Sequence, residues 1–151
     1  MIINRFNIRV YGLLINEEKR VLLCDEKIKG NLFTKFPGGG LEFGEGIVDC
    51  IVREFSEETK LEIKVIKHFY TTEYFQESAF NKNDQIISIY FLVNVIDKEE
   101  LFNFSKYIES DENKDSDESF KWVDVKNLSK ASVTLPIDKT VVGLLDNYFN
   151  I

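Results

Sequence analysis

A glycine-rich loop that leads into an amphipathic helix constrains this chain more than any other feature of its sequence. The loop comprises residues 37–40, Pro-Gly-Gly-Gly, and over residues 45–59 the apolar side chains recur at helical spacing. Successive glycines allow the backbone to approach a ligand closely, because no side chain intervenes. One apolar helix face predicts packing against a hydrophobic core. We therefore expect a buried helix face with the glycine loop beside it.

Three glutamates share another face of this predicted helix. Glu54, Glu57 and Glu58 stand at positions i, i+3 and i+4, which brings their carboxylates together. The like-charge pair of Glu54 and Glu58 costs roughly 0.2–0.5 kcal/mol, and the negative end of the helix dipole adds to the repulsion. Most helical glutamates form only a solvated face. Beside a glycine-rich loop, clustered carboxylates suit hard cations such as Mg²⁺ or Mn²⁺, so we predict a divalent-metal site.

The segment from Gly39 to Leu61 resembles the Nudix box, whose pattern is G-x5-E-x7-R-E-U-x-E-E-x-G-U with U an apolar residue. Gly39 and Glu45 hold the first two fixed positions, and residues 53–58, Arg-Glu-Phe-Ser-Glu-Glu, hold the central ones. The one departure is Lys60, which stands where the family has glycine. Glycine suits a left-handed residue that ends the helix. A lysine must accept a modest backbone penalty, or the helix must end differently.

The resemblance implies a metal-dependent hydrolase that cleaves the diphosphate linkage of a nucleoside diphosphate derivative by attack of water on phosphorus. The substrate would be a free nucleotide, a nucleotide sugar or a similar small molecule. Glu54, Glu57 and Glu58 would bind Mg²⁺ or Mn²⁺, with the carbonyl oxygen of Gly38 as a further candidate ligand. Glu54 and Glu57 are also candidate catalytic bases, and a carboxylate outside the box is the alternative.

Three other residues of the box would support the site rather than take part in the reaction. By the same resemblance, Glu45 and Arg53 would form an internal ion pair that steadies the loop against the helix. Gly39 belongs to the loop that this ion pair would hold in place. The box therefore implies both a reacting group of residues and a structural support for it.

Residues outside the box give weaker indications of substrate binding. Many relatives carry an arginine at the end of the second strand, near the phosphates, whereas this chain has Cys-Asp-Glu at residues 24–26. Arg9 and Lys35 are candidate replacements for substrate binding. The acidic residues 111–118 are typical of a solvated loop. Glu118 is the member of this stretch that we consider best placed to reach the metal ions.

The rest of the chain predicts an α/β fold. The apolar run at residues 85–96 is expected at the centre of a sheet, because neither of its faces is polar. The expected elements are strands at 5–15 and 20–24, paired antiparallel, a β-rich stretch at 61–75, the strand at 85–96, an irregular acidic segment at 97–119, a strand at 120–125 and a helix from Pro136 to about residue 149. Without repeats or linkers, residues 1–151 are expected to form a single domain. The resemblance implies a Nudix-like α/β/α sandwich with a mixed sheet between helices.

Composition narrows the partners and the compartment. Nineteen Lys and Arg residues against 26 Asp and Glu give a net charge of −7, a poor match to a nucleic-acid polymer. No apolar run reaches the roughly 18 residues of a membrane span, and the N-terminus lacks the features of a signal peptide. Cys24 and Cys50 lie in apolar stretches and are expected to be buried thiols. We therefore expect a cytoplasmic protein with a small-molecule partner, away from membranes, either monomeric or a homodimer.

Two other functions remain open at this point. The first is a catalytically weak nucleotide-binding or regulatory module with the Nudix fold. Such domains usually lose box carboxylates, whereas all three remain here, which favours the enzyme. The second is a pyrophosphohydrolase that acts on RNA ends. To bind an RNA polymer, such an enzyme would need clustered Lys and Arg, which the acidic composition disfavours.

Overall fold

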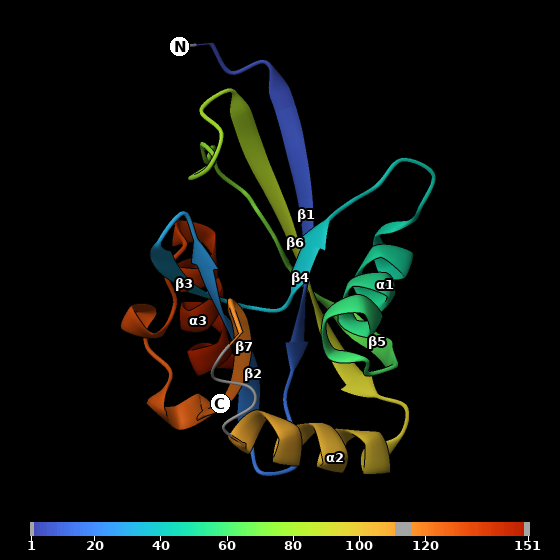
Figure 1. The fold of residues 1–151 in the computed structure, drawn as a ribbon. Coiled ribbons are helices and arrows are strands. Elements are labelled where there is room, and N and C mark those ends of the chain that lie inside the picture. The colour runs from blue at the N-terminus through green and yellow to red at the C-terminus, as the bar shows by residue number, and fades with distance from the viewer. Residues whose placement is uncertain (1, 111–115, 150–151) are drawn as a thin grey trace.

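The computed structural model describes residues 2–110 and 116–149 (Figure 1). The strands are β1 (Arg5–Leu14), β2 (Arg20–Ile28), β3 (Asn31–Lys35), β4 (Gly38–Gly40), β5 (Ile63–Thr71), β6 (Asp84–Val95) and β7 (Glu118–Asp124). The α-helices are α1 (Ile47–Thr59), α2 (Lys98–Glu109) and α3 (Pro136–Phe149), with short 3₁₀ turns η2 (Val125–Asn127) and η3 (Lys130–Ser132). These elements build two sheets with helices around them.

The strands divide into a four-stranded sheet of order β4-β1-β6-β5 and a three-stranded sheet of order β3-β2-β7. The first sheet is mixed, because β1 runs parallel to β6 and antiparallel to β4. The run predicted as a central strand is confirmed as β6, which lies between β1 and β5. Its apolar sequence follows from this inner position, where both faces are covered.

The predicted antiparallel pairing of the first two strands is wrong. β1 and β2 belong to different sheets, and an isolated bridge between Ile15 and Val21 joins them where the chain turns. The physical reason is that β6 pairs with β1 along its whole length and β4 takes the other edge at Arg9–Tyr11, so the middle of β1 is already hydrogen-bonded on each side. β2 therefore pairs with β3 and β7 instead.

Side chains that alternate along the strands pack into two hydrophobic cores. Val10 and Leu14 of β1 pack into one core with α1 and α2, whereas Tyr11 and Leu13 pack into the other with α3. In Figure 1, α1 and α3 accordingly lie on opposite sides of the sheets. The predicted α/β architecture, with a mixed sheet between helices, is confirmed.

The segment predicted as irregular at residues 97–119 contains helix α2, so that prediction is wrong. Asp97 caps the helix by accepting a hydrogen bond from the backbone N–H of Glu99 at 2.9 Å. Phe104 and Ile108, four residues apart, are the buried anchors of its apolar face. Leu101, Phe104 and Ile108 recur at helical spacing, so the sequence carries a signal for this helix that the surrounding charged residues obscure. The helix packs against β7.

The C-terminal helix begins at Pro136 and extends to Phe149, as predicted. Cys24 and Cys50 are buried free thiols, also as predicted. Within residues 2–110 and 116–149, none of the helices combines the length and the apolar character that crossing a membrane requires.

Candidate active site

Helix α1 places its glutamates at the margin of its buried face. Cys50, Ile51, Phe55 and Thr59 are buried in the core, Glu54 and Glu58 are half-buried beside them, and Glu57 is exposed to solvent. Strand β4 packs directly against this helix. The structure thus brings together the glycine loop and the carboxylates that the sequence singled out.

The backbone of Gly39 lies in close contact with the carboxylate of Glu54. A Cβ atom at Gly39 would stand 2.4 Å from both the Cδ and the Oε1 atom of Glu54. No residue with a side chain can occupy this position without moving Glu54. Gly38 is constrained differently, because its φ is 155° and a Cβ atom there would stand 2.1 Å from the carbonyl oxygen of Val10.

Arg53 joins the loop to the glutamate face. Its Nε and Nη2 atoms donate to the two carboxylate oxygens of Glu45 at 3.0 and 2.7 Å, and Nη2 also donates to the carbonyl oxygen of Gly40 at 3.2 Å. Its Nη1 atom donates to Glu54 at 2.9 Å and to Glu57 at 3.2 Å. The hydrogen bonds from Arg53 lower the pKa of Glu45 to about 2. Arg53 therefore orients two of the three box glutamates and ties them to the loop.

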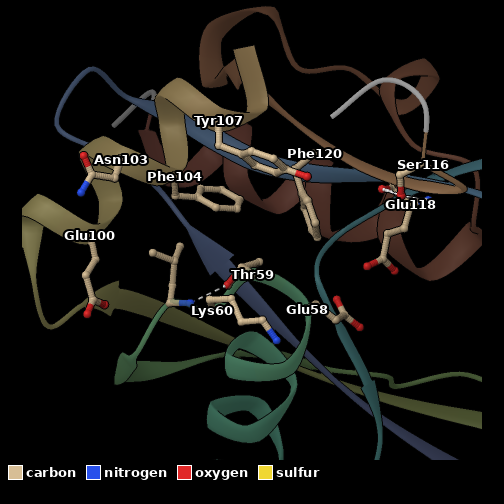
Figure 2. Close-up of a pocket in the computed structure, with 11 residues that line it drawn as sticks. Glu58, Thr59, Lys60, Glu100, Asn103, Phe104, Tyr107, Ser116, Glu118 and Phe120 are labelled. Carbon is tan, nitrogen blue, oxygen red and sulfur yellow. Dashed lines mark hydrogen bonds between the residues drawn. The ribbon is translucent and has the colours of Figure 1, made fainter. Parts of the chain in front are cut away.

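Glu58 differs from the other two because its charge is not compensated. Its Oε2 atom is buried and lacks a hydrogen-bond partner among the described residues. Burial, the neighbouring carboxylate of Glu118 and the neighbouring Glu54 raise the pKa of Glu58 well above its ordinary range. Figure 2 shows the carboxylates of Glu58 and Glu118 directed toward one another. Carboxyl groups are thus crowded at the end of α1, where a bound cation would favour their charged forms.

These residues fit a divalent cation in chemistry, although they do not form a finished ligand set. Carboxylate and carbonyl oxygens are the donors that Mg²⁺ and Mn²⁺ prefer, and the unpartnered Oε2 atom of Glu58 is such a donor. In the part of the chain that the structure describes, no group of three or more acidic, His or Cys side chains is arranged to hold a metal ion. The reason is visible in the geometry, since Arg53 holds Glu54 and Glu57.

Lys60 ends helix α1 in the left-handed conformation that the family's glycine would adopt. Its φ and ψ are 64° and 6°, and its backbone N–H donates to the carbonyl oxygen of Ser56 at 3.0 Å. Of the two alternatives considered, the backbone penalty is the one realised, at a cost of roughly 1–2 kcal/mol. The departure leaves the preceding glutamates on their helix face and places a lysine side chain beside them.

Arg9 and Lys35, which the sequence proposed for substrate binding, line one pocket of about 450 Å³. We call it the α3 pocket, since the start of α3 closes it through Pro136 and Asp138. The ammonium of Lys35 pairs with Glu26 at 2.7 Å, and Arg9 donates to the hydroxyl of Tyr11 at 3.2 Å. The pocket therefore combines cationic groups with an aromatic wall.

Sequence reasoning missed two members of this pocket, Asp138 and Tyr90. Asp138 is fully buried, and its Oδ1 atom accepts a hydrogen bond from the hydroxyl of Tyr90 at 2.5 Å. Its Oδ2 atom lacks a partner among the described residues. In the sequence, an aspartate two residues after a proline indicates only an ordinary first helical turn. No local signal shows that it is buried beside Arg9 and Lys35.

Asp138 is expected to make the protein less stable as the pH rises. Burial raises its pKa to about 7 from an ordinary 3.8, against the opposing effects of Tyr90, Lys35 and Arg9. Between these values the folded chain holds a proton that the unfolded chain has lost, so the free energy of unfolding falls as the pH rises. Between about pH 5 and pH 8 the fall is about 3 kcal/mol, and it should vanish in Asp138→Asn, whose amide keeps an acceptor for Tyr90 but does not titrate. Urea unfolding at about pH 5 and about pH 8 measures it, and parallel pH profiles of the two proteins would contradict it.

Comparison with known proteins identifies the family to which this fold and site belong. The family model of the NUDIX domain matches residues 5–142. The chain therefore belongs to the Nudix hydrolase family. Nucleoside diphosphate-linked moiety X motif 6 of Mus musculus is 30% identical over 131 residues, which cover 84% of this chain and 37% of the mouse protein. The chain thus spans little more than a third of the length of that relative.

Solved structures show the same fold. A NUDIX hydrolase from Nitrosomonas europaea superposes with a TM-score of 0.68 at 19% identity, covering 97% of this chain and 90% of the other. A MutT protein from Methanosarcina mazei Go1 superposes with a TM-score of 0.65 at 17% identity, covering 99% and 97%. At such identities the likeness concerns the fold alone.

Proposed function

We propose that this chain is a metal-dependent pyrophosphohydrolase that cleaves the diphosphate linkage of a small nucleoside diphosphate derivative. The observation that carries the proposal is the complete set of Glu54, Glu57 and Glu58 on one face of α1, with the backbone of Gly39 packed against Glu54. The name of the mouse relative, which refers to a nucleoside diphosphate-linked moiety, supports this substrate class.

The α3 pocket would bind the nucleoside end of the substrate. Arg9 and Lys35 would bind the adjoining phosphate oxygens, since guanidinium and ammonium groups are the usual protein partners of phosphate. Lys35 is nine-tenths buried and already paired with Glu26, so its position is fixed before a ligand arrives. Tyr11 and Tyr90 stack at 5.2 Å between ring centroids and give the pocket a rigid aromatic wall.

The box glutamates would perform the chemistry. When bound by Glu54, Glu57, Glu58 and the Gly38 carbonyl, Mg²⁺ or Mn²⁺ would neutralise phosphate oxygens and lower the pKa of the attacking water. Glu54 or Glu57 would accept the proton of that water. Arg53 would keep the side chains of Glu54 and Glu57 in place beside the loop through its hydrogen bonds of 2.9 and 3.2 Å.

A carboxylate outside the box remains a candidate base, and the acidic stretch supplies one. Residues 111–115 of that stretch lie outside the described residues. Glu118, at its end, opens strand β7 and faces Glu58 across the candidate site (Figure 2). Burial and the neighbouring Glu26 raise the pKa of Glu118. Its place beside Glu58 supports the proposal that it takes part in the same site.

The test is release of phosphate or pyrophosphate from a panel of nucleoside triphosphates, ADP-ribose, nucleotide sugars and dinucleoside polyphosphates. Each substrate is assayed with Mg²⁺, with Mn²⁺ and after chelation. We expect turnover of one substrate class that disappears on chelation, because water at neutral pH is a poor nucleophile without the ion. Binding of a nucleotide by the metal-loaded protein without turnover of any substrate would instead support the binding-module alternative.

A further inference from the structure

A second cavity, of about 650 Å³, lies between the end of α1 and helix α2 (Figure 2). We call it the α1–α2 cleft. Helix α2 lines it with Glu100, Asn103, Phe104 and Tyr107, which stand at i, i+3, i+4 and i+7 and so form one face of the helix. The helix that sequence reasoning missed therefore builds one wall of this cavity.

The cleft opens onto the candidate active site. Glu58 and Glu118 line its inner end, and Glu118 pairs in strand register with Glu26 of the α3 pocket. Glu26 in turn holds Lys35, at 2.7 Å. The carboxylate cluster thus stands between two cavities, the α3 pocket on one side and the α1–α2 cleft on the other. A substrate whose diphosphate lies at the box glutamates can extend into both.

The walls of the cleft define the kind of group that would enter it. Glu58, Glu100 and Glu118 place three carboxylates around it, against the single basic side chain of Lys60 among the lining residues. Beyond the cation that Glu58 would hold, the cleft offers Lys60 alone against Glu100, so it lacks the clustered positive charge that the end of a polyphosphate needs. Carboxylates and the Asn103 amide are good acceptors for hydroxyl groups.

Aromatic rings line the cleft beside these hydroxyl acceptors. Phe104, Tyr107 and Phe120 line the cleft, and Figure 2 shows their rings on the side opposite Lys60 and Glu58. Phe104 and Phe120 pack edge to face at 5.7 Å, which fixes both rings. Tyr107 is 47% exposed and free to cover a ligand. Apolar ring faces beside hydroxyl acceptors match a sugar, which presents C–H groups on its faces and hydroxyl groups at its edge.

We infer that the α1–α2 cleft binds a sugar that the nucleoside diphosphate carries beyond its second phosphate. The inference rests on the proposed function, because that function places the diphosphate at the box glutamates. It narrows the substrate class to nucleoside diphosphate sugars. Asn103 and Tyr107 are the specificity-determining residues, since both are exposed on the cleft face of α2.

The test compares Asn103→Ala/Tyr107→Ala with the control Phe102→Ala/Lys106→Ala, both on a Glu57→Gln background to prevent turnover. The control also removes one aromatic and one polar side chain, each one position earlier on α2. Phe102 and Lys106 do not line the cleft, and the Nζ atom of Lys106 lies 4.6 Å from the centroid of the Phe102 ring. Binding of UDP-glucose, ADP-ribose, UDP and ADP is measured by calorimetric titration with Mg²⁺. We expect the cleft variant to raise the Kd of the two sugar nucleotides about tenfold and to leave UDP and ADP within about twofold.

Other results separate the failure of this inference from the failure of the proposed function. If the cleft variant weakened the binding of sugar nucleotides and of UDP and ADP equally, α2 would not recognise the sugar. An equal effect of the control variant would show the same. Unchanged sugar-nucleotide binding beside metal-dependent turnover by the wild-type protein would refute the inference and leave the proposed function standing. The expected binding pattern without any wild-type turnover would support the inference and refute hydrolysis. No binding of any of the four ligands would overturn both.

Discussion

Glu57→Gln is expected to lower kcat by about 100- to 10,000-fold, the range that a general base contributes, while the protein stays folded. The side chain of Glu57 is 59% exposed, and its one described hydrogen bond is the 3.2 Å contact with Arg53. Glutamine keeps an oxygen for Arg53, but it carries no charge for a cation and cannot accept a proton. The measurement is steady-state kinetics on the best substrate of the panel, with circular dichroism and thermal unfolding as checks on the fold.

Glu62→Gln is the matched control for that experiment. Glu62 is an exposed glutamate just beyond the box, and it lies outside the lining of both the α3 pocket and the α1–α2 cleft. We expect its kcat to stay within about twofold of wild type, as for a surface substitution away from the site. If both variants retained full activity, Glu57 would be part of a solvated helix face and not of the catalytic machinery.

Gly39→Ala is expected to lower kcat/KM by about 100-fold with little change in stability, since small misplacements of a catalytic group have effects of this size. The added Cβ atom would lie 2.4 Å from the Glu54 carboxylate, which must then rotate away from Arg53. The obstructed atoms are the flexible end of a side chain, so the fold can adapt while the site cannot. Kinetics and urea unfolding on the same preparation separate the two effects.

The neighbouring glycines provide the contrast. Gly38→Ala places a Cβ atom 2.1 Å from the carbonyl oxygen of Val10 at a positive φ, so we expect a stability loss of about 3 kcal/mol or more. Gly40→Ala meets only the Nη1 atom of Arg9, at 3.4 Å, and should stay within about threefold of wild-type activity. If Gly39→Ala were as active as Gly40→Ala, the contact between the loop and Glu54 would have no part in function.

Some of the site could be predicted because it depends on neighbours along one helix. The spacing of Glu54, Glu57 and Glu58 fixes their common face wherever the helix packs, and the apolar face of residues 47–59 decides which side is buried. Local geometry is sufficient for these relations. The contact of Arg53 with Glu45, which spans eight residues, was instead implied by the resemblance to the Nudix box.

Other parts could not be predicted because they join residues far apart in the chain. Asp138 meets Tyr90 across 48 positions, and Arg9 of β1 lines the same pocket. Local periodicity of the sequence does not contain such long-range contacts. Helix α2 is a different case, because Leu101, Phe104 and Ile108 recur at helical spacing and only the charged residues around them made the segment resemble an acidic loop.

The sequence by itself determined the family resemblance, the helix that carries the glutamates, and the strands and C-terminal helix with strong apolar patterns. Short-range spacing sets these features, since side chains one or two helical turns apart share a face regardless of the rest of the fold. Only the tertiary structure decided that β1 and β2 separate into two sheets, that Arg9, Lys35 and Asp138 share the α3 pocket, and that α2 builds a second cavity beside the carboxylates. These outcomes follow from which strand edges remain free to pair and which distant apolar faces pack together, and both are properties of the assembled chain.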